Sequence, residues 1–157
     1  MYLGFQGVRA LVQVLPLWTI RALGRGLGLV AYGLLWDQRR LTLEHLAVAF
    51  GKTLSPAKRR RIAQGVFQHL AQNALEWMWL PRCSTDELLR LTTCEGLEHL
   101  RAALAQGNGA ILVTAHFGNW EMITLSLTAL GFKGAVLARR LRYPEYEAFL
   151  IALRGAR

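Results

Sequence analysis

A short apolar run constrains the fold of this chain more than any other feature. Residues 109–115, Gly-Ala-Ile-Leu-Val-Thr-Ala, contain branched side chains and no alternation of polar and apolar positions. Such a run indicates a strand that is buried on both faces, as in a parallel sheet that helices cover. Parallel strands need crossover connections, and segments with helical periodicity lie on both sides of this run. We therefore predict an α/β fold.

Helix start and stop signals surround the run. Ser55-Pro56 predicts a helix start, with serine as the cap and proline at the first helical position, and Pro81 predicts its end. The apolar residues that we expect to line one face of this helix are Ile62, Val66, Leu70, Ala74 and Trp77. Ser84 to Glu87 form a capping box that opens another helix. Further helices are predicted from Glu95-Gly96 to about Gln106, over residues 120–130 and over residues 144–153.

These signals divide the chain into three predicted parts. Residues 1–36 form an apolar, basic, membrane-associated helical segment, and residues 37–91 form a second helical part. Residues 92–157 contain two predicted strand–helix units, with strands at 109–115 and 134–138, and the pattern also allows a further short strand near 92–94. This last part is the start of a parallel sheet covered by helices. We expect the sheet to be truncated and incomplete at Arg157.

Composition points to an anionic membrane surface. The chain is 53% hydrophobic and has a formal net charge of +9, and no acidic residue precedes Asp37. Arg9, Arg21 and Arg25 interrupt the apolar stretch, which favours an interfacial helix or a helical pair bent at Pro16 over a single span. Zinc-finger spacing and aromatic RNA-binding signatures are missing from the sequence, so we do not expect a nucleic-acid partner.

Glycines and cysteines in the sequence are read as structural residues. The segment Gly24-Arg25-Gly26-Leu27-Gly28 follows no predicted strand, so it is interpreted as a site of close helix packing and not as a dinucleotide loop. Cys83 and Cys94 form no Cys-x-x-Cys pair and no Cys/His metal spacing. They are interpreted as small buried hydrophobic residues. We therefore expect no metal site.

His116 and Glu121 are the candidate catalytic pair. His116 follows the predicted strand, and ligands of open α/β sheets gather beyond the carboxyl ends of strands. Glu121 would lie in the first turn of the next helix, with Asn119 as its N-cap. A carboxylate on one ring nitrogen fixes the histidine tautomer and strengthens the other nitrogen as a base. The spacing alone favours the alternative of a strand-end histidine and an unrelated helix-cap carboxylate, and the surrounding block of residues reverses that preference.

The block "HFGNWE", with "EGLEHLRAALAQGNGAILVTA" before it and "VLARRLRYPEYEAFLIALR" after it, resembles the lipid A biosynthesis late acyltransferases. This resemblance runs from about Gln38 to the last residue. It implies a glycerolipid-acyltransferase-like fold and a bacterial inner-membrane enzyme on the cytoplasmic face. The implied reaction moves a fatty acyl chain from acyl carrier protein to a hydroxyl of a lipid A precursor, and it implies His116 as the base and Glu121 as its partner.

The resemblance to this family also suggests roles for the remaining site residues. Arg139, with Arg154 as second choice, is predicted to bind phosphate, because a guanidinium binds phosphate bidentately and the resemblance implies a phosphorylated acceptor. Solvent exposure is the alternative for Arg139 and for its neighbours Arg140 and Arg142. Asn119 is assigned as a helix cap at the substrate site, where backbone N–H groups can face a developing oxyanion. No cofactor is expected, because a thioester is already activated. The competing hypothesis is a truncated, inactive fragment that only associates with the membrane.

Overall fold

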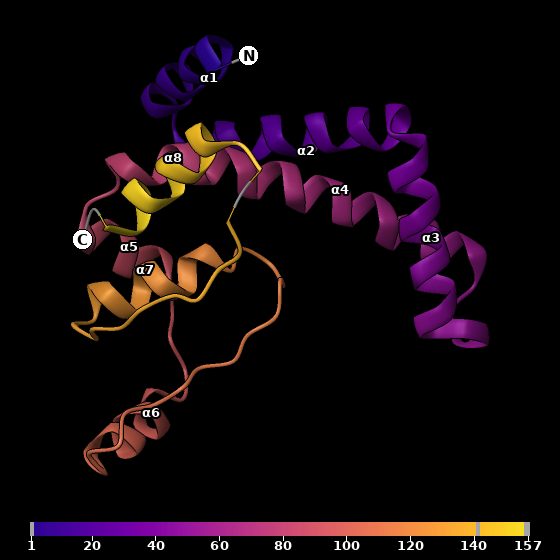
Figure 1. The fold of residues 1–157 in the computed structure, drawn as a ribbon. Helices are drawn as coiled ribbons and strands as arrows, with labels where there is room; N and C mark the ends of the chain where they lie inside the picture. Colours follow the sequence, from indigo (N-terminus) through magenta and orange to yellow (C-terminus); the bar gives the residue numbers. More distant parts are fainter. Residues whose placement is uncertain (1, 141, 156–157) are drawn as a thin grey trace. The chain divides into compact units, whose positions relative to one another are not determined.

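The computed structural model describes residues 2–140 and 142–155, and Figure 1 shows its helices in chain order. The elements are α1 (Tyr2–Val14), α2 (Leu17–Leu34), α3 (Trp36–Phe50), η1 (Gly51–Thr53), α4 (Pro56–Trp79), η2 (Leu80–Arg82), α5 (Thr85–Leu91), α6 (Leu97–Ala105), α7 (Glu121–Ala129) and α8 (Pro144–Gly155). The chain divides into two compact units, unit 1 (Met1–Leu80) and unit 2 (Pro81–Arg157). The division into three parts stays a prediction.

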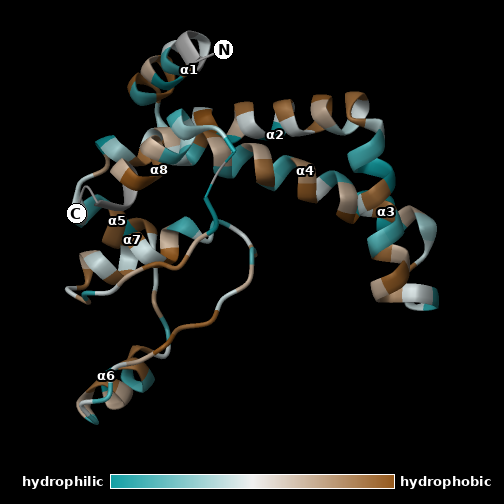
Figure 2. Ribbon diagram, viewed as in Figure 1, coloured by the Kyte–Doolittle hydropathy of each residue, from teal (hydrophilic) through white to brown (hydrophobic). Residues whose placement is uncertain are grey.

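The parallel sheet predicted from the sequence is wrong. The described residues form helices, turns and loops, and none of them is in a strand. In the predicted strands, Ile111 is 94% exposed, Val113 is 92% exposed and Leu137 is fully exposed. Figure 2 shows the apolar loop that leads to α7 in brown. An apolar run favours a buried strand only where a second strand supplies backbone hydrogen bonds, and the described residues contain no such pairing.

The helical pair bent at Pro16 is confirmed. Pro16 has an extended backbone, with φ −64° and ψ 149°, so it separates α1 from α2. Its carbonyl oxygen accepts hydrogen bonds from the N–H groups of Thr19 and Ile20, at 3.1 and 3.2 Å, and so begins α2. In the part of the chain that the structure describes, no helix combines the length and the apolar content needed to cross a membrane.

Close packing at the glycines of α2 is also confirmed. Ile20, Gly24 and Gly28 are the buried residues of α2. A Cβ atom at Gly24 would lie 2.7 Å from the Cα atom of Gln72, and one at Gly28 would lie 2.4 Å from the Cα atom of Gln68. Because such distances are shorter than any real Cβ contact, only glycine lets α2 and α4 approach this closely. The two helices lie side by side in unit 1.

This packing corrects the predicted apolar face of α4. Val66 and Leu70, which we expected in the core, are 38% and 51% exposed. The buried residues of α4 are instead Ala63, Phe67, Gln72, Asn73, Leu75 and Trp79. The glycines of α2 bring the backbone of α4 into contact near Gln68 and Gln72, which turns the predicted stripe away from α2. The helix start at Ser55 is confirmed, since its Oγ accepts a hydrogen bond from the N–H of Lys58.

Two polar contacts fix the start of α2 on the end of α4. The indole Nε1 of Trp79 donates to the carbonyl oxygen of Leu15 at 3.1 Å. Arg21 forms an ion pair with Glu76, with 2.7 Å between Nε and Oε1. Trp79 is buried and Glu76 is mostly covered, so both contacts are partly shielded from water. Because they join the start of α2 to the end of α4, the two helices run antiparallel.

Unit 2 has a smaller core between α5 and α7. Ser84 caps α5, because its Oγ accepts a hydrogen bond from the N–H of Glu87 at 3.1 Å, as the capping box predicts. Leu88 on α5 and Leu125 on α7 are almost completely buried, and these helices are in contact. The predicted helices α6 and α8 are present. Cys83 is buried, Cys94 is half-buried, and both are free thiols.

Candidate active site

His116 lies in the loop directly before α7, with its side chain exposed to solvent. Its ring contacts the indole of Trp120, with 4.7 Å between the centroids and 58° between the ring planes. A tilted arrangement at this distance is a favourable aromatic contact. The imidazole is therefore supported on one face by Trp120 and accessible to a ligand from solvent.

A tight turn brings these two rings together. Gly118 has φ +57°, in the left-handed region that glycine adopts without strain. The N–H of Phe117 donates to the carbonyl oxygen of Ala115 at 2.8 Å, which closes the chain just before this glycine. The bend at these residues places the ring of His116 against that of Trp120. The phenylalanine of the block points outward and is 88% exposed.

Glu121 is the first residue of α7 and is only 3% exposed. The N-terminal turn of a helix stabilises a carboxylate through the macrodipole. The prediction of Asn119 as N-cap is wrong by one residue, because Trp120 is the N-cap and makes no side-chain cap hydrogen bond. Asn119 instead contributes its carbonyl oxygen, which accepts from the N–H of Met122 at 3.0 Å. Trp120 itself has helical backbone angles, φ −61° and ψ −24°, so the boundary lies within one residue of the predicted one.

The structure holds His116 and Glu121 at the same loop–helix junction without joining them. Within the described residues, the imidazole makes its tilted ring contact with Trp120, and no hydrogen bond or ion pair connects it to Glu121. A hydrogen bond between the two would require the imidazole or the carboxylate to turn from its present position. The catalytic pairing stays a prediction.

The arginines proposed for phosphate binding lie in or after the loop between α7 and α8. Arg139 and Arg140 are exposed, and neither forms an ion pair or hydrogen bond within the described residues. The guanidinium of Arg142 lies 5.9 Å from the ring centroid of Tyr143. Arg154 is in α8, but its side chain lies outside the part of the chain that the structure describes. An exposed arginine can meet a phosphate, and these roles stay predictions.

Trp120 contacts His116 but is not among the site residues predicted from the sequence. The signal that could have identified it is its position just across the glycine turn from His116. A search of the described residues finds no group of three or more His, Cys, Asp or Glu side chains that could hold a metal ion.

Comparison with known proteins identifies the class of protein. Residues 1–156 match the family described as bacterial lipid A biosynthesis acyltransferase. The lipid A biosynthesis lauroyltransferase of Escherichia coli (strain K12) is 30% identical over 129 residues, which cover 80% of this chain and 39% of that enzyme. The phosphatidylinositol mannoside acyltransferase of Mycobacterium tuberculosis is 44% identical over 57 residues, 35% of this chain and 18% of that enzyme. No solved structure matches significantly.

Both relatives are named as acyltransferases, one of lipid A biosynthesis and the other of phosphatidylinositol mannoside. The chain belongs to the bacterial lipid A biosynthesis acyltransferase family. The matched region spans less than half the length of each of these relatives. The family resemblance of the "HFGNWE" block is thereby confirmed.

Proposed function

We propose that this protein transfers a fatty acyl chain from acyl carrier protein to a hydroxyl of a lipid A precursor, with His116 as general base. Membership of the acyltransferase family carries this proposal, together with the exposed imidazole of His116 at the start of α7. The E. coli relative is named for lauroyl transfer in lipid A biosynthesis. The proposed site is the junction between the loop at His116 and the start of α7, within the block whose resemblance to the family is most specific.

The chemistry requires one base and no cofactor. A ring nitrogen of His116 removes the proton from the acceptor hydroxyl as its oxygen attacks the thioester carbonyl. The new C–O bond forms a tetrahedral oxyanion, which collapses as the C–S bond breaks. The imidazolium returns the proton to the departing thiolate. The products are an ester and a free thiol, and the base ends in its original state.

Neighbouring residues have supporting roles in this proposal. Glu121 stabilises the imidazolium and fixes the tautomer once the ring turns toward the carboxylate. Backbone N–H groups beside Asn119 face the oxyanion, where preorganised donors stabilise developing charge. Arg139, and Arg154 after it, bind phosphate of the acceptor through their guanidinium groups. The aromatic face of Trp120 keeps the imidazole at the loop–helix junction.

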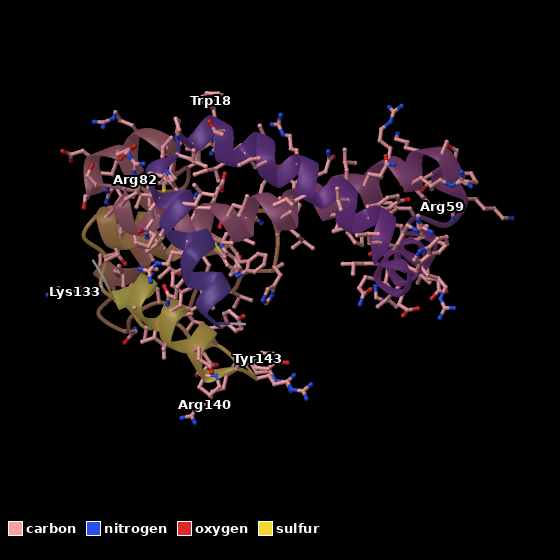
Figure 3. The ribbon with its side chains drawn as sticks, turned by 90° about the horizontal axis from the view of Figure 1, so that it is seen from above. Trp18, Arg59, Arg82, Lys133, Arg140 and Tyr143 are labelled. Atoms are coloured by element: carbon pink, nitrogen blue, oxygen red, sulfur yellow. The ribbon has the colours of Figure 1, made fainter. Side chains whose placement is uncertain are left out.

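The proposed setting is the cytoplasmic face of the bacterial inner membrane. A lipid A precursor is amphipathic, and the apolar acyl chain reaches it on a carrier protein from the aqueous side, so an enzyme that joins them has to work where lipid and water meet. The net charge of +9 and the exposed apolar residues of unit 1, including Trp18 at 73%, suit an anionic membrane surface. Figure 3 shows Trp18 projecting away from α2.

An acyl-transfer assay with histidine variants tests the proposal. The substrates are lauroyl acyl carrier protein and a detergent-dispersed, phosphorylated lipid A precursor, and mass spectrometry detects the added acyl group. His116→Ala is expected to lower the turnover by about a hundred- to ten-thousandfold, the range of general-base catalysis. His99→Ala is the matched control, because His99 is an exposed histidine of unit 2 beside Glu98. Turnover by His116→Ala at the unmodified rate, or no transfer by the unmodified chain, would overturn the proposal.

A second candidate function is membrane association without acyl transfer. The specific observation that favours it is the amount of exposed apolar surface on α2, where Leu27, Val30 and Leu34 are 53%, 57% and 71% exposed. The same assay separates the two candidates, because vesicle binding does not need an assembled catalytic site. Binding to vesicles with no acylated product would favour this second function.

A further inference from the structure

A long stretch of unit 1 contains no acidic residue. None occurs between Glu44 on α3 and Glu76 on α4, while five basic residues do. Both of these bounding acids already have cationic partners. Glu44 lies 3.5 Å from Arg40, and Glu76 lies 2.7 Å from Arg21. The five basic residues between them therefore lack an acid within their own segment.

The five cations gather at one end of unit 1, which we call the basic tip. It consists of Lys52 on η1 and the first turns of α4, and its members are Lys52, Lys58, Arg59, Arg60 and Arg61. Four of these side chains are exposed and Arg59 is half-buried. None of the five forms an ion pair within the described residues. Figure 3 shows Arg59 where α3 meets the beginning of α4.

Helix stability does not explain this placement. The first turn of α4 contains no acidic residue and carries Lys58 and Arg59, with two more arginines directly after them. Cations near a helix N-terminus oppose the macrodipole, whereas acidic residues there typically stabilise a helix by about 0.3–1 kcal/mol each. The basic tip thus lowers the stability of the helix that carries it. A negatively charged partner would offset that cost.

Exposed apolar side chains beside the basic tip indicate which partner. Val48 and Phe50, at the end of α3, are 86% and 44% exposed, and α3 contains no buried residue. Because the chain passes from Phe50 through η1 to α4, these apolar residues and the cations share one end of the unit. Free phosphate offers charge but no apolar contact. A lipid bilayer offers anionic headgroups and acyl chains together.

The beginning of α3 has a second interfacial feature. The guanidinium of Arg39 lies 4.0 Å from the ring centroid of Trp36 and 5.4 Å from that of Tyr32. Trp36 is 68% exposed. Tryptophan, tyrosine and arginine are the side chains that favour the level of lipid headgroups. Both ends of α3 therefore present groups that suit the same environment.

We propose that the basic tip binds anionic phospholipid headgroups while Val48 and Phe50 enter the acyl boundary beside them. This inference rests on the membrane setting of the proposed function and goes beyond it by naming the binding surface and the lipid class. Unit 1 carries ten of the nineteen lysine and arginine residues but three of the ten acidic ones, so it is the strongly cationic unit. Attraction to an anionic leaflet would draw this end of unit 1 to the surface.

Vesicle sedimentation with charge-matched variants tests the inference. The probe is phosphatidylcholine vesicles with and without phosphatidylglycerol. Arg60→Glu/Arg61→Glu is expected to lower binding to the anionic vesicles by about thirtyfold or more, since each basic residue at such a surface strengthens binding about fivefold. The matched control is Arg90→Glu/Lys133→Glu, two exposed cations of unit 2 with the same change in net charge. The control is expected to retain most of the binding.

Replacing the apolar residues is expected to change vesicle binding in a different way from replacing the cations. Val48→Ser/Phe50→Ser is expected to weaken binding to neutral and anionic vesicles by a similar factor, because the apolar contribution does not depend on headgroup charge. Thermal unfolding checks that the glutamate variants fold. They are expected to be at least as stable as the unmodified chain, because they remove cations from the start of α4.

Several results would overturn the inference. Equal loss of binding in both charge variants would assign the effect to net charge alone. Unchanged vesicle binding by Arg60→Glu/Arg61→Glu, with lost binding to acyl carrier protein in its place, would assign the basic tip to an acidic protein. Acyl transfer to detergent-dispersed acceptor is measured on the same variants. Absence of transfer by the unmodified chain would refute the proposed function alone, whereas failure of the unmodified chain to bind anionic vesicles would refute this inference alone.

Discussion

Gly28 on α2 lies against the backbone of Gln68 on α4, so closely that a Cβ atom added to the glycine would lie 2.4 Å from the Cα atom of Gln68. The neighbouring contact at Gly24 has the same character. Since backbone atoms cannot move aside as the end of a flexible side chain can, the spacing of the two helices depends on these glycines. The close approach of α2 and α4 in unit 1 is therefore made by the backbone of α2 at its glycines, and not by a side chain.

Gly28→Ala should destabilise unit 1 by about 1–3 kcal/mol, the usual cost of overpacking a tight contact. The helices would have to separate, which would also disturb the burial of Ile20. Gly26→Ala is the matched control on the same helix, because a Cβ atom there meets nothing within 4 Å. That control should stabilise the helix by about 0.5–1 kcal/mol. Chemical denaturation measures both, and equal effects would contradict the packing described above.

Leu125→Ala should destabilise unit 2 by about 2–5 kcal/mol, because it removes a side chain that is only 1% exposed and leaves a cavity. Ile123→Ala, on the same helix, should cost much less, since Ile123 is 41% exposed. Hydrogen exchange of α5 and α7 amides reports the loss of local stability. Similar exchange in the two variants would show that Leu125 does not anchor α7.

Glu121→Gln should lower acyl transfer by about tenfold or more while leaving the binding of acceptor nearly unchanged. An amide keeps the shape of the side chain but cannot supply the negative charge that stabilises the imidazolium. The reduction should be smaller than that of His116→Ala, because the base itself remains. Turnover and KM are measured separately, and thermal unfolding excludes a folding defect at this buried position. An unchanged turnover number would remove Glu121 from the catalytic pair.

Arg139→Ala should raise the KM for a phosphorylated acceptor by about ten- to a hundredfold, since hydrogen bonds to charged groups typically contribute about 1.5–3 kcal/mol. The same variant should behave like the unmodified chain with a dephosphorylated acceptor. Arg90→Ala, an exposed arginine on α5, is the control and should change neither value. A raised KM with both acceptors would point to a structural effect instead of phosphate recognition.

The sequence correctly predicted helix starts and breaks, because the groups that interact there are only a few residues apart. The cap at Ser55, the capping box at Ser84 and the break at Pro16 all appear in the structure. Each depends on a side chain and a backbone group that are at most a few residues apart. The N-cap of α7 lies one residue after the predicted Asn119, at Trp120, which is the usual precision of a helix boundary.

The sequence was less informative about the site. The block from His116 to Glu121 identified the family and placed both residues beside the start of a helix. It could not indicate that the imidazole would stack on Trp120, because that contact depends on the left-handed backbone of Gly118 and on the rotamers of both rings. The burial of Glu121 is likewise a property of the folded chain.

The sequence by itself determined the family, the positions of the helices and the cationic, apolar character of unit 1, because these follow from residue identity and local spacing. Tertiary structure decided which residues are buried. The face of α4 that lies in the core was set by the glycines of α2, and the run at residues 109–115 remained unpaired. The physical reason is that a strand or a buried face requires a partner surface, and the hydrogen bonds and van der Waals contacts of that partner come from distant residues.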